Sequence, residues 1–365
     1  MLKFQQIFKI FFNFTAKENK VFDTEYSFIF AFLTSLIITF LATPKVISFA
    51  DRYRLSDIPG KRSSHKRSVP VFGGLAIFSG VIFSMFFWGK LADVQFIVLS
   101  FIIVFFVGVI DDLLSLTPFK KLFGQIIAIL IVIYLSELRI DSMHGVLGIY
   151  DLPNIIASLF TIFVVVVITN AFNLIDGVDG LASGIGLISS FCFGFIAVLM
   201  SQLEMAIIAF SLMGALFGFM KYNFNPARIF MGDSGSLLVG MILSVLAINN
   251  IRHGLVFENF GLPNKGPLMA IVFLAVPLFD AFRVFIVRII KGKHPLYPGR
   301  EHIHHVLLDL GFGHKGAAIS LFFVSFLLVV SAYFLLTLNI NLGIFILAIF
   351  AFIILLIPVF LRNYK

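Results

Sequence analysis

The feature that most constrains the fold is a succession of long apolar segments along almost the whole sequence. A helix needs ~20 residues to cross the hydrocarbon core of a membrane, and these segments approach that length. The sequence therefore predicts an all-α polytopic integral membrane protein with about eleven transmembrane helices. They are expected at residues 26–50, 71–90, 94–110, 119–136, 154–172, 180–200, 203–222, 234–250, 267–290, 317–337 and 341–361.

The composition supports the same class. Hydrophobic residues make up 60% and charged residues 13% of the chain, whereas soluble domains are usually about 45–50% apolar and about 25% charged. No polar stretch is long enough for a second domain, so we expect an N-terminal tail at 1–25 and one transmembrane domain at 26–365. The single cysteine, Cys192, lies in an apolar run, which indicates a packing residue and excludes a disulfide framework.

The basic residues indicate how the chain is oriented. A net charge of +8 is compatible with nucleic-acid binding, but Lys and Arg in a membrane protein more often mark cytoplasmic loops. Most of them fall in the connections after the first, third, fifth, seventh and ninth spans. We therefore expect that side to be cytoplasmic, and we expect no nucleic-acid partner. On the other side, the connection 137–153 is expected to form a small hairpin.

Five polar clusters fall on the side predicted to be cytoplasmic. They occupy residues 57–74, 111–112, 170–180, 223–236 and 294–305. Ionisable groups at a membrane boundary are costly and tend to face protein, water or ligand rather than lipid. The shared location of the five clusters predicts one composite active site in cytoplasmic loops.

The third cluster contains Asn173, Asp176 and Asp179. The two acids are three residues apart and would share a face if the segment were helical. Oxygen ligands of this kind suit Mg²⁺ or Mn²⁺ that retains waters and binds a phosphate substrate. Helix capping by Asn and Asp would account for one or two of the polar residues in this cluster, but not for all of them.

The first and second clusters each allow two interpretations. Lys66 belongs to a basic run ahead of Gly73-Gly74, where cations and a helix start suit a phosphate ligand, although a plain lipid-binding loop has the same composition. The adjacent Asp111 and Asp112 repel each other, and a cation, a general-base role or a basic partner would relieve that repulsion. The alternative is a pair of solvated acids at the membrane interface.

The fourth and fifth clusters carry further chemistry. Asp233 or Ser234 is a candidate helix N-cap. The Gly-Asp-Ser-Gly lettering there does not indicate a serine hydrolase, because the spacing of a nucleophile elbow is absent. Residues 302–305 include three histidines close to Arg300, which suit a clamp on pyrophosphate. A zinc site is disfavoured, since neither cysteine nor a His-Glu-x-x-His spacing supports it.

Four motifs follow one another along the chain: Asp111-Asp112, Asn170-x-x-Asn173-x-x-Asp176-Gly-x-Asp179-Gly, Phe230-Met-Gly-Asp233-x-Gly-Ser236 and His302-Ile-His-His305. This ordered set resembles the polyprenyl-phosphate N-acetylhexosamine-1-phosphate transferase family, and the resemblance extends from about the first span to about Gly313. The His-Ile-His-His form resembles the branch that transfers GlcNAc-1-phosphate. Relatives that transfer phospho-N-acetylmuramoyl-pentapeptide usually carry three consecutive histidines, whereas Val306 follows here.

The resemblance implies a role for each matching residue. Asp111 resembles the proposed base toward the lipid phosphate, and Asp112 supports the metal or the base. Asp233 resembles the principal Mg²⁺ ligand, with Asn173 as a second ligand and Mn²⁺ as an alternative metal. Catalytic roles are implied for Asp111, Asp112, Asp233 and His304. Substrate contacts are implied for Lys66, Asn173, Asp176, Gly177, Asp179, Phe230, Arg300, His304 and His305.

The implied reaction is attack of undecaprenyl phosphate on the β-phosphorus of a UDP-N-acetylhexosamine, with release of UMP. GlcNAc is the favoured sugar, the location is a bacterial inner membrane, and the product would start a lipid-linked cell-envelope polysaccharide. Direct attack is favoured over a covalent intermediate at Asp111, but the sequence does not decide between them. Neither the exact sugar nor the pathway served can be read from the residues. A homodimer is compatible with the family and has no signature in the sequence.

Two other classes of protein compete with a transferase. A transporter or channel also holds acids and histidines in membrane segments, often near the midplane between inverted repeats. This chain shows no convincing repeat, and its charges lie at loop edges. A non-catalytic lipid-binding scaffold would not need so many regularly spaced acids. Release of UMP from UDP-GlcNAc would distinguish the enzyme from both.

Overall fold

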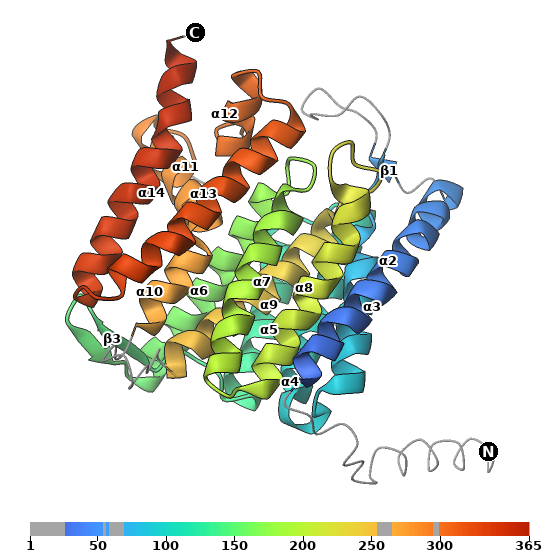
Figure 1. Ribbon diagram of the computed structural model, residues 1–365, viewed down its shortest axis with the longest axis horizontal. Helices are drawn as coiled ribbons and strands as arrows, with labels where there is room; N and C mark the ends of the chain where they lie inside the picture. Colours follow the sequence, from blue (N-terminus) through green and yellow to red (C-terminus); the bar gives the residue numbers. More distant parts are fainter. Residues whose placement is uncertain (1–25, 54–55, 58–68, 254–264, 295–298, 365) are drawn as a thin grey trace.

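The computed structural model describes residues 26–53, 56–57, 69–253, 265–294 and 299–364, and within them the chain forms a bundle of helices (Figure 1). The expected tail at 1–25 lies outside the described residues. The helices are α2 Ser27–Tyr53, α3 Gly73–Trp88, α4 Leu91–Leu114, α5 Pro118–Leu135, α6 Asn154–Ile175, α7 Leu181–Leu199, α8 Leu203–Asn223, α9 Gly232–His253, α10 Gly266–Phe273, α11 Ala275–Ile290, α12 Ile303–Asp309, α13 His314–Leu335 and α14 Ile340–Asn363.

The prediction of an all-α polytopic membrane protein is confirmed. Among the described residues, nine helices are long and apolar enough to cross a membrane, namely α2, α4 to α9, α13 and α14. A tenth span is reached if α10 and α11 are counted together. The second predicted span is occupied by α3, which has 16 residues and is therefore shorter than a typical membrane helix. The short helix α12 was not predicted.

The expectation of one continuous helix at 267–290 is wrong. This segment is two helices, α10 and α11, which meet at Leu274 with a bend of 79°. Pro277 lies in the first turn of α11 and has no backbone N–H to donate to the carbonyl of Phe273, four residues earlier. A proline is a common cause of a sharp helix bend. The break turns α11 away from the axis of α10.

Helix α9 forms the centre of the bundle, with α4, α6 and α3 packed around it (Figure 1). Every residue of α9 from Ser234 to Asn250 is buried. Close packing here depends on a glycine, because a Cβ on Gly240 would lie 2.7 Å from the Cα of Thr169 on α6. The outer helices differ from α9 in exposing large apolar side chains, such as Phe345 and Phe360 on α14. Exposed apolar side chains of this kind suit contact with lipid.

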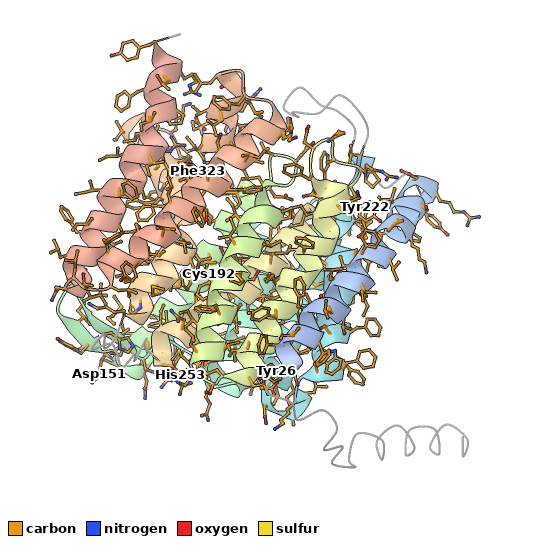
Figure 2. The ribbon with its side chains drawn as sticks, viewed as in Figure 1. Tyr26, Asp151, Cys192, Tyr222, His253 and Phe323 are labelled. Carbon is orange, nitrogen blue, oxygen red and sulfur yellow. The ribbon has the colours of Figure 1, made fainter. Side chains whose placement is uncertain are left out.

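The two ends of the bundle carry different small elements. One end has the strand pair β1 (Ser56–Asp57) and β2 (Val69–Pro70) together with α12 (Figure 1). The other end has the hairpin of β3 (Ser142–Val146) and β4 (Ile149–Asp151), which confirms the hairpin predicted between α5 and α6. Tyr222 marks the first end and His253 the second in Figure 2, while Cys192 is buried between them in α7. The first is called the site end below.

Candidate active site

The site is organised around the N-terminus of α9, which is capped by a side chain from another helix. The Asp112 carboxylate, in the last turn of α4, accepts hydrogen bonds from the backbone N–H groups of Asp233 (2.7 Å) and Ser234 (3.0 Å). The first N–H groups of a helix lack partners within the helix, and a carboxylate both satisfies them and complements the helix dipole. The capping group is therefore Asp112, rather than Asp233 or Ser234 as the sequence suggested.

Two glycines allow α3 and α4 to approach this helix start. A Cβ on Gly108 of α4 would lie 2.4 Å from the Cα of Ser234, and a Cβ on Gly74 of α3 would lie 2.3 Å from the backbone nitrogen of Gly235. Both distances are shorter than any side chain tolerates against backbone atoms. The second cluster and the Gly73-Gly74 end of the first are thus brought to the fourth by backbone contact.

The carboxylates of Asp111 and Asp233 meet at one ammonium group. Lys121, in the first turn of α5, places its Nζ 3.0 Å from Asp111 Oδ2 and 2.8 Å from Asp233 Oδ2. Asn173, near the end of α6, donates its amide to Asp233 Oδ1 and to Ser236 Oγ (2.9 Å). Four helix ends therefore contribute to one polar cluster, which is defined here as the acid–lysine cluster of Asp111, Lys121, Asn173 and Asp233.

The acids Asp176 and Asp179 lie in the turn between α6 and α7, so they do not share a helical face. Burial, together with the nearby carboxylates of Asp233 and Asp112, raises the pKa of Asp176 well above its usual range. Burial alone would also raise the pKa of Asp179, but hydrogen bonds from His314, Ala227 and Asn225 lower it.

The partners of Asp179 come from two further connections. Its Oδ2 accepts hydrogen bonds from the side-chain amide of Asn225 (3.1 Å) and from the backbone N–H of Ala227 (3.0 Å), while its Oδ1 lies 3.1 Å from Nδ1 of His314. Asp179 therefore ties the turn before α7 to the connection before α9 and to the start of α13. Its expected contact with a nucleotide stays a prediction.

The histidines of the fifth cluster reach the Asp176–Gly180 turn through His304. This side chain is 1% exposed, and a Cβ on Gly177 would lie 2.6 Å from its Nε2. Burial lowers the pKa of His304 to about 3, so the ring is neutral at physiological pH. Burial and the charge of Arg300 also lower the pKa of His305. The structure thus joins Gly177 and His304, which the sequence predicted separately.

Three of the expected substrate residues lie elsewhere or act through the backbone. Arg300 is 54% exposed and its guanidinium is 3.6 Å from Asp309, at the end of α12. Phe230 holds two segments together, since its N–H donates to the carbonyl of Pro70 (2.8 Å) and its carbonyl accepts from Gly73 (3.0 Å). Lys66 falls outside the described residues. Their expected substrate contacts remain predictions.

Comparisons with known proteins show the family of the chain. Residues 94–251 match the family described as glycosyl transferase family 4. A relative from Bacillus subtilis, named a probable undecaprenyl-phosphate N-acetylglucosaminyl 1-phosphate transferase, is 32% identical over 87% of this chain and 87% of its own length. The chain belongs to glycosyl transferase family 4. The resemblance found in the motifs, and the expectation of a transferase enzyme, are thereby confirmed.

Two further relatives show the range within the family. The decaprenyl-phosphate N-acetylglucosaminephosphotransferase of Mycolicibacterium smegmatis is 32% identical, with 80% of this chain and 77% of the relative covered. The phospho-N-acetylmuramoyl-pentapeptide-transferase of Borrelia hermsii is 29% identical, with 85% of this chain and 94% of the relative covered. The matched region 94–251 contains the acid–lysine cluster but ends before the histidines of α12.

The acid–lysine cluster of this family 4 protein has donors that fit Mg²⁺. Among the described residues, no group of three or more His, Cys, Asp or Glu side chains is arranged to hold a metal ion by itself. Mg²⁺, however, is commonly held by one or two carboxylates while water and substrate phosphate complete its octahedron. Asp233, Asp111 and the amide oxygen of Asn173 are hard oxygen donors of that type. The donor set therefore suits a cation that is bound together with a phosphate substrate.

Lys121 is the residue of this cluster to which the sequence analysis gave no role, because it was counted among the loop charges near Asp111 and Asp112. The available signal was its position: it follows Asp111 by ten residues, after the short connection between α4 and α5. A connection this short places the first turn of α5 beside the last turn of α4. A lysine there can reach the acid of its neighbour.

Proposed function

We propose that this family 4 transferase moves N-acetylglucosamine-1-phosphate from UDP-GlcNAc to undecaprenyl phosphate and releases UMP. The observation that carries the proposal is the acid–lysine cluster, in which two carboxylates, an amide and an ammonium meet at one end of a bundle of membrane helices. A water-soluble sugar nucleotide and a membrane-embedded lipid phosphate can meet only at such an end. The Bacillus subtilis and Mycolicibacterium smegmatis relatives support GlcNAc as the sugar.

The bond changes set the demands on the site. An oxygen of the lipid phosphate attacks the β-phosphorus of the sugar nucleotide, and the bond between that phosphorus and the bridging oxygen of UMP breaks. One diphosphate linkage forms as another is lost, so the reaction is close to balanced and reversible. Both substrates are anions, and catalysis of phosphoryl transfer rests mainly on positioning and on charge neutralisation. Lys121 supplies one positive charge where the two phosphates would meet.

The cofactor proposed is Mg²⁺, with Mn²⁺ as a substitute. Asp233 and Asn173 would hold it, and when bound it would neutralise phosphate charge and orient the diphosphate.

Asp111 is proposed to face the lipid phosphate as its base, with Leu116 N–H donating to Asp111 Oδ1 (2.6 Å) and fixing the carboxylate. The sugar nucleotide is proposed to bind to the residues around the turn before α7, namely Asp176, Gly177, Asp179, Phe230 and the histidines of α12. Direct attack is favoured, because two anions need only be brought together; trapping of a phosphoryl-aspartate from UDP-GlcNAc without lipid would overturn this.

The proposed location is the inner membrane of a bacterium, with the site end toward the cytoplasm. The excess of Lys and Arg in the connections at that end supports this orientation. The product would start a lipid-linked cell-envelope polysaccharide. A homodimer in the membrane is also proposed. Cross-linking in intact membranes, and accessibility of cysteines introduced at either end of the bundle, would test assembly and orientation.

The function is tested with membranes, undecaprenyl phosphate and radiolabelled UDP-GlcNAc, with and without Mg²⁺. Mg²⁺-dependent label in the lipid phase that is reversed by added UMP would support the reaction, the sugar and the cofactor together. Label in the lipid without Mg²⁺ would exclude Mg²⁺ as the cofactor but would leave the reaction and the sugar supported. No label would exclude GlcNAc.

A second sugar substrate is favoured by one observation, the Borrelia hermsii relative with its muramoyl-pentapeptide substrate. UMP exchange with a panel of UDP-sugars separates the two. Exchange with UDP-N-acetylmuramoyl-pentapeptide and not with UDP-GlcNAc would replace the proposed substrate, whereas exchange with no UDP-sugar would reject the transferase reaction.

A further inference from the structure

The least expected charged residue is Asp280, which is completely buried in α11, one of the two halves of the broken span. A carboxylate inside a membrane protein is costly, and one that persists is a candidate for a role in function. Its two oxygens contact three residues, described below. None of them belongs to the acid–lysine cluster, and no motif of the sequence analysis included Asp280.

Asp280 and Arg283 hold three consecutive residues at the start of α12. Asp280 Oδ1 accepts the backbone N–H of Ile303 (3.0 Å), and Asp280 Oδ2 lies 2.9 Å from Nδ1 of His302. Arg283, one turn further along α11, donates to Asp280 Oδ1 (2.7 Å) and to the carbonyl of Glu301 (2.6 Å). Residues 301, 302 and 303 are thereby fixed to α11, which sets the direction of the His302 ring.

The contact to His302 also decides which ring nitrogen remains for a ligand. A carboxylate can only accept at neutral pH, so Nδ1 of His302 carries the proton that faces Asp280. The other nitrogen, Nε2, is buried and has no hydrogen-bond partner among the described residues. The His302 ring lies parallel to that of His304, with centroids 5.8 Å apart and planes within 7°. His304 in turn contacts Gly177 in the turn assigned to the nucleotide.

We propose that Asp280 is a positioning residue of the transfer reaction, which orients His302 so that its unprotonated Nε2 accepts a hydrogen bond from a hydroxyl or N–H group of the sugar nucleotide. The proposal rests on the proposed function, since it names how one element of that site is built. A cap on the Ile303 N–H alone would need only a neutral acceptor such as an amide, at a lower cost of burial than a carboxylate. The charge serves both side chains beside it: it pairs with the buried Arg283, and it holds the imidazole of His302 in one tautomer and orientation.

The test compares Asp280→Asn with Val284→Ala in the full-length enzyme. Asn keeps the size of Asp280 and an acceptor for Ile303, but it lacks the charge that fixes His302. Val284 is a buried residue of the same helix, so its truncation reports what loosening α11 does by itself. Asp280→Glu keeps the charge and should restore part of the activity lost in Asp280→Asn.

We expect Asp280→Asn to lower kcat by roughly 10- to 100-fold, the range seen when carboxylate partners of metal-binding histidines are removed. The KM for UDP-GlcNAc should rise while the KM for undecaprenyl phosphate stays unchanged, because the histidines adjoin the turn assigned to the nucleotide. Thermal stability in detergent should fall as well, because Asn leaves the buried Arg283 without its ion pair, so kcat and KM are compared at a temperature where each variant is folded. Wild-type kinetics in Asp280→Asn, or an equal loss in Val284→Ala, would overturn the proposal.

A second measurement does not depend on the transfer reaction. The ¹⁵N spectrum of histidine-labelled protein, with His302 assigned from its loss in His302→Gln, should show a protonated Nδ1 and an unprotonated Nε2 in the neutral ring. Asp280→Asn should disturb this tautomer. The opposite tautomer in the wild-type protein would refute the positioning role, even if the enzyme transferred a different sugar. Conversely, if the wild-type protein showed the expected tautomer but no transfer activity, the proposed function would be rejected. The contact between Asp280 and His302 would still be supported.

Discussion

Replacing Lys121 with Met tests whether the ammonium of the acid–lysine cluster takes part in the reaction. Met keeps the length and most of the apolar stem of the lysine, so the packing of α5 changes little. The substitution removes an ammonium that contacts both Asp111 and Asp233, at 3.0 and 2.8 Å. Two carboxylates are then left side by side where two phosphate groups are to be bound.

The size of the effect follows from those distances. At an effective dielectric constant of ~20, unit charges 3 Å apart attract by about 5–6 kcal/mol before desolvation is counted. Removal of one partner from a buried, hydrogen-bonded charge pair costs about 2–5 kcal/mol. The Asp233 side chain is 32% exposed, which places the effect toward the lower end of this range. A loss of about 2–3 kcal/mol in the transition state corresponds to a fall in kcat/KM of roughly 30- to 150-fold.

The assay measures initial rates of lipid labelling at saturating Mg²⁺ in detergent-solubilised protein. Lys120→Met is the matched control, because Lys120 is the neighbouring lysine on the same turn and its side chain is exposed. It should retain wild-type kinetics. If Lys121→Met kept wild-type kcat/KM, or if both variants lost activity equally, the ammonium would have no special role and the charge argument would fail.

Four further substitutions address single features of the site. Asp233→Asn should nearly abolish lipid labelling at saturating Mg²⁺ while the melting temperature stays close to wild type; normal turnover would remove Asp233 from the mechanism. Gly108→Ala should lower the yield of folded protein in detergent, because the added methyl would lie 2.4 Å from the Cα of Ser234. Asp112→Asn should mainly lower the melting temperature, by weakening the cap of α9, and an unchanged melting temperature would contradict that role. His304 has its pKa lowered by burial from 6.5 to about 3, so the unfolded chain binds a proton that the folded chain does not; stability should fall by about 2 kcal/mol between pH 7 and pH 5. His304→Gln should reduce this dependence in melting curves to the share left by His305, whose pKa burial also lowers, and an unchanged slope would refute the argument.

Most of the membrane helices could be predicted because the length of each apolar run can be read directly from the sequence. The break at Leu274 was missed for the opposite reason: the run 267–290 is apolar throughout, and hydropathy alone does not register Pro277. Proline is tolerated in membrane helices, so its presence did not by itself predict a bend of 79°. The bend matters for the site, since the second half of this span carries Asp280 to the start of α12.

The site residues divide in a similar way. Asp111, Asn173 and Asp233 could be predicted because each lies in a polar motif at the edge of an apolar run. Lys121 and Asp280 could not, because their significance lies in what they contact. Lys121 pairs with acids of α4 and α9, and Asp280 faces His302, which is 22 residues away in the chain. The spacing of Asp280 and Arg283 fits one turn of a helix, but no spacing in the sequence links Asp280 to His302 or Lys121 to Asp233.

The adjacent pair Asp111-Asp112 shows why both acids are needed. Successive residues of a helix project about 100° apart, so neighbouring side chains face different surroundings. Asp112 turns toward the backbone of α9 and caps it, whereas Asp111 turns toward Lys121. The cap fixes the N-terminus of α9 and hence the position of Asp233 relative to Asp111. A shift of α4 by one residue would put the apolar Ile110 or Leu113 in one of the two positions, and the close contact of Gly108 with Ser234 opposes such a shift. One acid therefore sets the geometry that the other uses.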